Sequence, residues 1–249
     1  MIKLAICGVC GKMGKRIAVL ASRDREVSIA TATEIKGCSL VGVKLGGELK
    51  TNDLGVLISD DLAASIEKCD CVIDFTLPEA TMGNLEVALR YKKPIVIGTT
   101  GFSEPQVQEI TAAAQRIPVL FAPNMSVSVN LIFDVVEKLT KSLGGRYKIR
   151  MEEVHHIHKK DKPSGTGKLI AGIIKNIRKD IDDVPIESIR QGEVVGDHRI
   201  IFDSEEDTIE VIHRAKTRDI FAIGAIQGAK YLAGKQAGLY GMKDVLEAL

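Results

Sequence analysis

Three histidines and a lysine gather in one short segment of the chain. The run His-His-Ile-His-Lys at residues 155–159 holds three of the five histidines within four residues. Histidine titrates near neutral pH and the pKa of lysine can be tuned downward, so their adjacency offers two proton donors for one small anionic substrate. We therefore expect the chemistry of this protein to take place at this segment.

The residues that follow predict the start of a helix with an anion-binding end. Pro163 disfavours helix before it, and Ser164 is a good N-cap. The backbone N–H groups of Gly165 and Thr166 would then point outward at the positive end of the helix, where a carboxylate or phosphate fits. One apolar stripe at helical spacing would hold this helix on a core: Leu169, Ile170, Ile173, Ile174 and Ile177.

Three other interpretations of this segment stay open. Gly167 and Lys168 resemble the end of a Walker A loop, but Lys162 stands where its first glycine belongs and Leu169 replaces its Ser/Thr. A metal site built from the three histidines lacks a second ligand pair at a recognisable spacing, and we expect no metal. The third interpretation is a solvated basic loop without function, which would leave a costly cluster of positive charge without an anionic partner.

The composition is that of a soluble globular protein. The 249 residues are 45% hydrophobic, and 34 Lys and Arg against 33 Asp and Glu give a net charge of +1, so nothing global favours nucleic acid or a membrane surface as a partner. No apolar run reaches the ~18 residues of a membrane span, and the N-terminus reads as a strand, so we expect a cytoplasmic protein.

The cysteines favour reduced thiols over disulfides. Five is an odd number in a fairly long chain, which fits an intracellular protein. Cys7 and Cys10 form a CxxC, but this pair overlaps a glycine loop and has no second cysteine pair of matching spacing. We interpret Cys7 as a buried strand residue, with a redox or zinc role as the less favoured alternative.

The N-terminal segment predicts a dinucleotide site. Residues 2–7 read as a buried strand, Gly8, Gly11 and Gly14 follow in the spacing GxxGxxG, and a helical pattern begins at once. These glycines allow a tight turn, close approach of backbone to a pyrophosphate, and close helix packing. A second strand at 27–33 ends in Glu34, 20 residues beyond Gly14, where an acid can accept hydrogen bonds from ribose hydroxyls.

Further strands at 71–75, 94–97 and 119–122 alternate with helical segments, which predicts a parallel sheet with ligands at its carboxyl ends. Residues 37–55 read as an irregular loop and 62–67 as a short helix. The predicted cofactor-binding residues come from the glycine turn, the end of the second strand and two later strand ends: Gly8, Val9, Cys10, Gly11, Lys12, Met13, Glu34, Gly98, Thr99, Thr100, Ala122, Pro123, Asn124 and Met125.

The pattern changes after residue 126. A helix at 130–143, a strand at 147–154 and a hairpin of strands 199–202 and 208–212 predict a mostly antiparallel or mixed sheet with helices on one face, whose other face could pair with another subunit. From 219 the chain returns to helix, with a small-residue face at Gly224, Ala225, Gly228 and Ala229. The predicted domains are a dinucleotide-binding domain (1–126), a substrate and oligomerisation domain (127–218) and a returning segment (219–249), an α/β fold overall.

Taken together, these motifs resemble the dihydrodipicolinate reductase family almost from end to end. The resemblance rests on the GxxGKMG turn, Glu34, Ile97-Gly-Thr-Thr-Gly-Phe102, Asn124-Met-Ser-Val127 and above all Glu153-Val-His-His-Ile-His-Lys159 with Pro163-Ser-Gly-Thr166. It implies a Rossmann-like first domain and a cytoplasmic homotetramer. The implied activity is the NADH- or NADPH-dependent reduction of 4-hydroxy-tetrahydrodipicolinate, with loss of water, toward diaminopimelate and lysine.

Residue roles follow from the same resemblance. His155 would be the proton donor/acceptor, Lys159 a second proton donor and His156 a substrate contact, while Gly165 and Thr166 would bind a substrate carboxylate. Two rivals remain: another two-domain nicotinamide dehydrogenase that shares only the first 125 residues, and a catalytically silent nucleotide-binding protein.

The chain departs from the family pattern where a cofactor 2′-phosphate would bind. Ile35 and Leu77 stand where many relatives carry arginine; Met125 stands where phenylalanine is common, and Cys10 lies within the glycine turn. Other cations could offset part of the missing charge: Lys12, Arg16, Lys36, Lys44 and Lys50. We therefore expect use of both cofactors with NADH at least equal.

Overall fold

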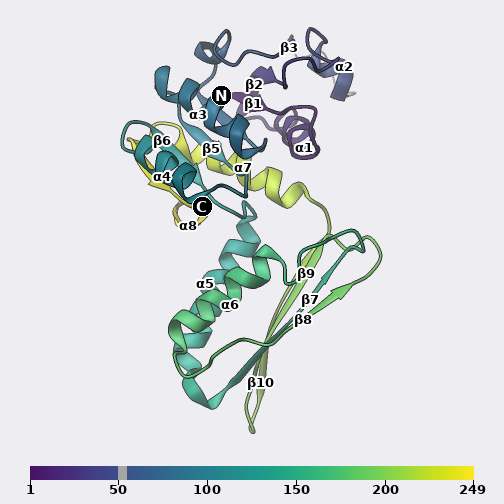
Figure 1. Cartoon of the computed structure of the whole chain (residues 1–249), viewed down its shortest axis with the longest axis vertical. Helices are drawn as coiled ribbons and strands as arrows, with labels where there is room; N and C mark the ends of the chain where they lie inside the picture. The colour runs from purple at the N-terminus through teal and green to yellow at the C-terminus, as the bar shows by residue number, and fades with distance from the viewer. Residues whose placement is uncertain (50–54) are drawn as a thin grey trace. The chain divides into compact units, whose positions relative to one another are not determined.

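The structure of the chain is a computed structural model that describes residues 1–49 and 55–249. The chain divides into two compact units. Unit 1 combines Met1–Ser126 with Phe221–Leu249, and unit 2 is Val127–Ile220. Both are drawn in Figure 1, and each is described by itself below.

Unit 1 is built on a seven-stranded sheet in the order β11-β6-β5-β4-β1-β2-β3, and every pair is parallel. The strands are β1 (Ile2–Cys7), β2 (Val27–Thr33), β3 (Ile58–Ser59), β4 (Cys71–Asp74), β5 (Ile95–Ile97), β6 (Pro118–Phe121) and β11 (Gly238–Tyr240). The helices are α1 (Lys12–Ala21), α2 (Leu45–Leu49), the 3-10 turn η1 (Ile66–Lys68), α3 (Pro78–Arg90), α4 (Glu104–Ala113), α7 (Asp219–Leu232) and α8 (Met242–Leu246). The predicted Rossmann-like parallel sheet is confirmed.

Helices cover both faces of this sheet (Figure 1). On one face, alternate strand residues such as Val72 and Ile95 pack with Leu85 of α3 and Ile110 of α4 in a buried cluster. The small residues of α7 serve the close packing predicted for them, because a Cβ added to Gly224 would lie 1.6 Å from the Met125 carbonyl oxygen.

Two local predictions in unit 1 were wrong. The stretch read as irregular loop from 37 to 55 contains the short helix α2, and a bridge between Lys44 and Leu57 leads into the edge strand β3. Residues 62–67 form turns and only a 3-10 turn at Ile66–Lys68 instead of an α-helix. The five-residue helix and the three-residue 3-10 turn are both shorter than the window over which hydrophobic periodicity distinguishes structures. Lys50 lies outside the described residues.

Unit 2 is a four-stranded mixed sheet in the order β10-β9-β7-β8, with the β7–β8 pair parallel and the other pairs antiparallel. Its elements are α5 (Val127–Leu143), the 3-10 turn η2 (Gly144–Arg146), β7 (Lys148–His155), α6 (Gly165–Ile177), β8 (Ile186–Arg190), β9 (Gly196–Asp203) and β10 (Thr208–Ala215). Helices α5 and α6 cover one face of the sheet, as expected (Figure 1). Strand β8 was not predicted from the sequence.

The helix-covered face of the unit 2 sheet changes from apolar to polar along its strands. Met151, Ile200 and Phe202 pack under the helices with Ile170 and Ile174 of α6. Leu169 belongs to the apolar stripe predicted for this helix, but its side chain is exposed. Two residues further along β7 the same face carries Glu153, because side chains alternate across a strand. This polar end of the covered face is where the predicted chemistry lies.

Candidate functional site

A cavity of about 470 Å³ opens at the carboxyl ends of β1, β2 and β4 in unit 1. Gly8, Gly11 and Glu34 line it, which brings together the glycine turn and the acid at the end of β2, as predicted. Phe75, Thr76 and Asn84 line it too, from β4 and α3. Parallel strands place their carboxyl ends at one edge of a sheet, and that edge is where α/β folds bind ligands.

The glycine turn is shaped for close approach of a ligand to backbone. Gly8 has φ +68°, a conformation that side chains disfavour, and a Cβ on Gly14 would lie 2.1 Å from the Gly8 carbonyl oxygen. Helix α1 begins after Gly11 without a side-chain cap, whereas Ser103 caps α4 and Ser164 caps α6. An uncapped helix N-terminus beside a cavity fits the pyrophosphate of a dinucleotide.

The other predicted cofactor residues differ in what they present. Val9, Thr99, Ala122 and Met125 are buried, so they can offer a ligand little more than backbone atoms. Lys12, Thr100 and Pro123 are exposed, and Met13, Gly98 and Asn124 are half-buried. The residues after β5 and β6 do not line the cavity; they lie at the neighbouring strand ends of the same parallel sheet.

Asp74 is a site feature that the sequence reading missed. Its carboxylate is 0% exposed at the end of β4 and accepts hydrogen bonds from Thr76 Oγ1 at 2.7 Å, Thr81 Oγ1 at 3.0 Å and Asn84 Nδ2 at 2.7 Å. Thr99 Oγ1 lies 3.3 Å away. Asp74 therefore fixes the loops after β4 and β5 through neutral donors. An aspartate at the end of an apolar strand was the available signal.

Glu153 is the centre of the polar cluster in unit 2, and the sequence reading gave it no role. The carboxylate is 0% exposed and accepts hydrogen bonds from Ser164 Oγ at 2.6 Å, the Ser164 N–H at 2.9 Å and Ser188 Oγ at 2.9 Å. Burial alone would raise its pKa, but these hydrogen bonds outweigh burial and the pKa is lowered. Glu153 is therefore an anion inside unit 2.

Cationic and titratable groups surround this anion. His155 Nδ1 lies 4.0 Å, His198 Nε2 3.9 Å and an Arg190 guanidinium nitrogen 3.7 Å from the Glu153 carboxylate. The His155 and His198 rings meet edge to face with centroids 5.2 Å apart, and His213 follows at 6.5 Å from His198. The alternation of β7 could have found Glu153, since it puts Glu153 and His155 on the face of Ile149 and Met151.

Burial dominates the titration of these histidines. It lowers the pKa of His155, a shift that Glu153 opposes and Lys159 reinforces. Burial, with the neighbouring His155, lowers the pKa of His198 to about 4. A buried imidazole with a lowered pKa gives up a proton readily, as a general acid must.

The loop after β7 carries Lys159, His156 and His158. The Lys159 ammonium pairs with Asp161 at 2.8 Å, and Arg190 donates to the Lys159 carbonyl at 3.2 Å, which ties the loop to β8. His156 is half-buried, and His158 is exposed beside Glu193. The three loop histidines thus occupy different environments, and their ligand atoms do not meet within the described part of the chain.

The predicted helix start is confirmed. Ser164 is the N-cap of α6 and accepts the Gly167 N–H at 3.0 Å. Gly165 is exposed and Thr166 half-buried at the first turn, where helix N–H groups point outward. A Cβ on Gly167 would lie 2.7 Å from the Glu153 carboxylate, so this glycine lets the helix reach the buried anion.

A parallel dinucleotide-binding sheet, joined in one chain to a mixed sheet with a buried cluster of titratable side chains, is the architecture of a two-domain oxidoreductase. Comparison with known proteins identifies the family. Residues 2–125 match the dihydrodipicolinate reductase N-terminus and residues 128–246 its C-terminus. The chain belongs to the dihydrodipicolinate reductase family.

Individual members of this family are similar to the chain over its full length. The chain is 39% identical to a 4-hydroxy-tetrahydrodipicolinate reductase of Magnetococcus marinus over 98% of both chains, and 40% identical to that of Geobacter sulfurreducens over 99% of both. Among solved structures it is similar to a dipicolinate-bound dihydrodipicolinate reductase from Paenisporosarcina sp. TG-14, with a TM-score of 0.83 and 23% identity over 99% of this chain and 100% of the other. At that identity the structural match supports the fold.

Proposed function

We propose that this protein reduces 4-hydroxy-tetrahydrodipicolinate to tetrahydrodipicolinate with loss of water, using NADH or NADPH, in diaminopimelate and lysine biosynthesis. The observation that carries the proposal is the polar end of unit 2, where a histidine and a lysine stand beside a buried anion and a helix N-terminus. A bound nicotinamide cofactor supplies the hydride, and the protein must supply one proton for each substrate reduced.

His155 and Lys159 are the proposed proton donors. Glu153 faces His155 Nδ1 and stabilises the protonated imidazole through charge, which offsets part of the burial penalty. Lys159, paired with Asp161 in the free protein, can exchange that partner for an anionic substrate. After donation, His155 is neutral, the form that burial favours.

The substrate has two carboxylates, and the start of α6 is the proposed cradle for one of them. Gly165 and Thr166 offer backbone N–H groups and a hydroxyl at the positive end of the helix. His156, half-buried beside the loop lysines, is a proposed contact for the same ligand. The Ser164 cap and Glu153 hold this helix start in place from behind.

In unit 1 the glycine turn and uncapped α1 are proposed to hold the cofactor pyrophosphate, and Glu34 its ribose hydroxyls. Ile35 is 76% exposed and Leu77 is 69% exposed at the cavity rim, so the positions that could hold a 2′-phosphate-binding arginine are apolar. This supports the proposal that NADH serves at least as well as NADPH.

A homotetramer in the cytoplasm is the proposed setting. Helices cover one face of the unit 2 sheet, and the opposite face exposes Ile189 and Ile212 among charged side chains. No disulfide joins the five cysteines, all of which lie in the described residues, and this fits a reducing compartment. Of the helices in the described residues, none has the length and apolarity to span a membrane. Light scattering during size-exclusion chromatography measures the oligomeric state directly.

The decisive assay is oxidation of NADH when freshly made 4-hydroxy-tetrahydrodipicolinate is added to the purified protein. Substrate-dependent oxidation, inhibited by pyridine-2,6-dicarboxylate, is the expected result. Oxidation with an amino acid or a sugar instead would favour another nicotinamide dehydrogenase. Binding of NADH without turnover of any of these substrates would favour a nucleotide-binding protein.

A further inference from the structure

Three side chains of metal-ligand type meet beside the cavity of unit 1. The Cys10 Sγ, a Glu34 carboxylate oxygen and the Cys38 Sγ all lie within 4.8 Å of one another, and each residue is half-buried. Among the side chains that the structure describes, no other group of three His, Cys, Asp or Glu comes as close. We propose that this cluster binds a thiophilic divalent cation of the zinc class, in competition with the dinucleotide for Glu34.

Two backbone turns hold the cluster together before any ion binds. Cys10 lies in the glycine turn, which a hydrogen bond from the Val9 N–H to the Thr33 carbonyl at 3.0 Å ties to the end of β2. Glu34 follows Thr33 directly. The chain then folds back, with the Cys38 N–H donating to the Ile35 carbonyl at 3.1 Å. Gly37 makes this turn possible, because it has φ +85°.

The donor set selects the kind of ion. Two thiolates and one carboxylate suit zinc, cobalt or cadmium, whereas magnesium and calcium prefer oxygen ligands. Around a tetrahedral zinc ion with Zn–S bonds of about 2.3 Å, two sulfur ligands lie roughly 3.8 Å apart. The ligand atoms lie within 4.8 Å of one another, so the two sulfur atoms would approach by at most about 1 Å on binding. Three protein ligands leave a fourth position for water.

The other cysteines take no part in this cluster. Cys7 completes the CxxC with Cys10, but it is buried at the end of β1, and burial raises the pKa of its thiol. Burial also raises the pKa of Cys69 to about 11. A thiol must lose its proton to ligate zinc. The partner of Cys10 is therefore Cys38, 28 residues along the chain, and the sequence spacing gave no sign of it.

Glu34 couples the cation to the cofactor. A carboxylate that ligates zinc cannot also accept hydrogen bonds from the ribose hydroxyls, so each ligand should weaken the other. This consequence, unlike the metal site itself, rests on the proposed cofactor site. With free zinc at ten times its own dissociation constant, the apparent Kd for NADH should rise about 10-fold.

The test uses the full chain with reduced thiols and Co²⁺ as a spectroscopic probe. Binding at the cluster should produce a thiolate-to-cobalt charge-transfer band in the near ultraviolet, which Zn²⁺ should abolish by displacement. Cys38→Ser should weaken the binding of both ions by at least about 100-fold, since it removes a thiolate ligand. Cys69→Ala removes a buried thiol outside the cluster, and it should keep the parent band.

NADH fluorescence then measures cofactor affinity with and without Zn²⁺. Zinc should weaken NADH binding to the parent and to Cys69→Ala, but not to Cys38→Ser. Absence of the charge-transfer band, or a band that persists unchanged in Cys38→Ser, would overturn the site. Parent NADH affinity that zinc leaves unaltered would overturn the competition. Because cobalt binding needs no substrate, a protein that binds the ion but does not oxidise NADH contradicts only the proposed function.

Discussion

Each unit contains a fully buried carboxylate, Asp74 in unit 1 and Glu153 in unit 2, and the two are held differently. Asp74 accepts hydrogen bonds from threonine hydroxyls, an asparagine amide and backbone, all of them neutral donors. Glu153 accepts from Ser164 and Ser188 but also faces two histidines and an arginine. Asp74 thus holds the loops after β4 and β5 in place, whereas Glu153 sets the electrostatic environment of the neighbouring histidines and arginine.

This difference follows from what each unit has to present. A dinucleotide is bound largely by backbone N–H groups and one acid, so unit 1 needs strand ends and turns held in fixed positions. A reaction that consumes a proton needs titratable groups with adjusted pKa values, and a buried anion beside imidazoles adjusts them. Variants should therefore separate cofactor binding from proton delivery.

The largest expected effect is on proton delivery. Lys159→Met and His155→Gln should each lower turnover by ~10²- to 10⁴-fold, the range for a lost general acid. The dissociation constant for NADH should change little, because both residues belong to unit 2 while the proposed cofactor residues belong to unit 1. Steady-state rates and NADH fluorescence measure the two quantities. Turnover within a few-fold of the parent in either variant would refute proton transfer at this loop.

Exchanging each buried carboxylate for its amide tests the comparison itself. Glu153→Gln keeps the shape but removes the charge that opposes the lowering of the His155 pKa, so turnover should fall about 10²-fold. The alkaline limb of the pH–rate profile, where the required acid His155 loses its proton, should shift to lower pH, which a merely structural loss would not cause.

Asp74→Asn is the matched control in unit 1. It leaves hydroxyl donors without an anionic acceptor, so it should cost about 1–3 kcal/mol of unfolding free energy and weaken NADH binding. The alkaline limb of its pH–rate profile should match that of the parent. If Asp74→Asn moved that limb as much as Glu153→Gln does, the distinction between the two anions would be wrong.

The buried histidines of unit 2 should make stability depend on pH. Folding holds His198 neutral with a pKa of about 4, against 6.5 ordinarily, so between these values the unfolded chain binds more protons. Stability present above pH 6.5 is therefore lost as pH falls toward 4, on the order of 3 kcal/mol from this residue. His155 and His213, whose pKa values burial also lowers, add to the same trend.

Urea unfolding at pH 7.5 and pH 4.5 measures this loss. His198→Gln should lose less stability between the two values than the parent does. His158→Gln removes an exposed histidine and should keep the parent dependence. Equal pH dependence in parent and His198→Gln would show that His198 is not held neutral.

The sequence predicted best where function lies in backbone and spacing. Gly8, Glu34 and Ser164 could be placed because a glycine turn, an acid after a strand and an N-cap are local patterns. Glu153 and His198 could not be joined, because they come from strands 45 residues apart whose pairing only the fold reveals. Cys10 and Cys38 meet for the same reason, through the parallel pairing of β1 with β2.

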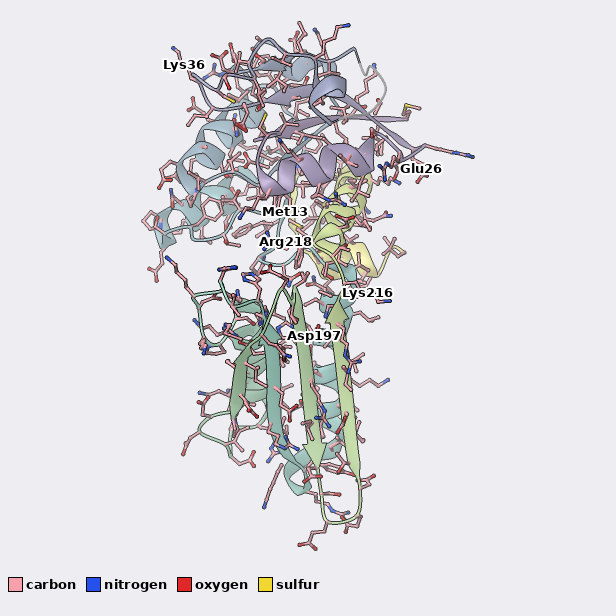
Figure 2. All side chains as sticks on the ribbon, turned by 90° about the vertical axis from the view of Figure 1, so that its right-hand side faces the viewer. Met13, Glu26, Lys36, Asp197, Lys216 and Arg218 are labelled. Carbon is pink, nitrogen blue, oxygen red and sulfur yellow. The ribbon has the colours of Figure 1, made fainter. Side chains whose placement is uncertain are left out.

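The smallest effect concerns cofactor choice, and it tests unit 1 alone. Glu34 would face the 2′-phosphate of NADPH, and like charges about 4 Å apart cost on the order of 4 kcal/mol per unit pair at an effective dielectric of ~20, less where solvent screens them. Lys36, exposed on the cavity rim and labelled in Figure 2, can offset part of this cost. We expect the parent to use both cofactors, with NADH at least equal.

Ile35→Arg should shift the ratio of kcat/KM toward NADPH by about 10-fold, because a guanidinium pairs with a phosphate in bidentate fashion. Ile157→Arg adds the same charge at an exposed position of unit 2 and controls for the overall change in charge. Both ratios are measured at fixed salt. A parent that favours NADPH tenfold or more would contradict the role given to Glu34 and Ile35. An equal shift in Ile157→Arg would mean that net charge, and not pairing at the cavity rim, sets the preference.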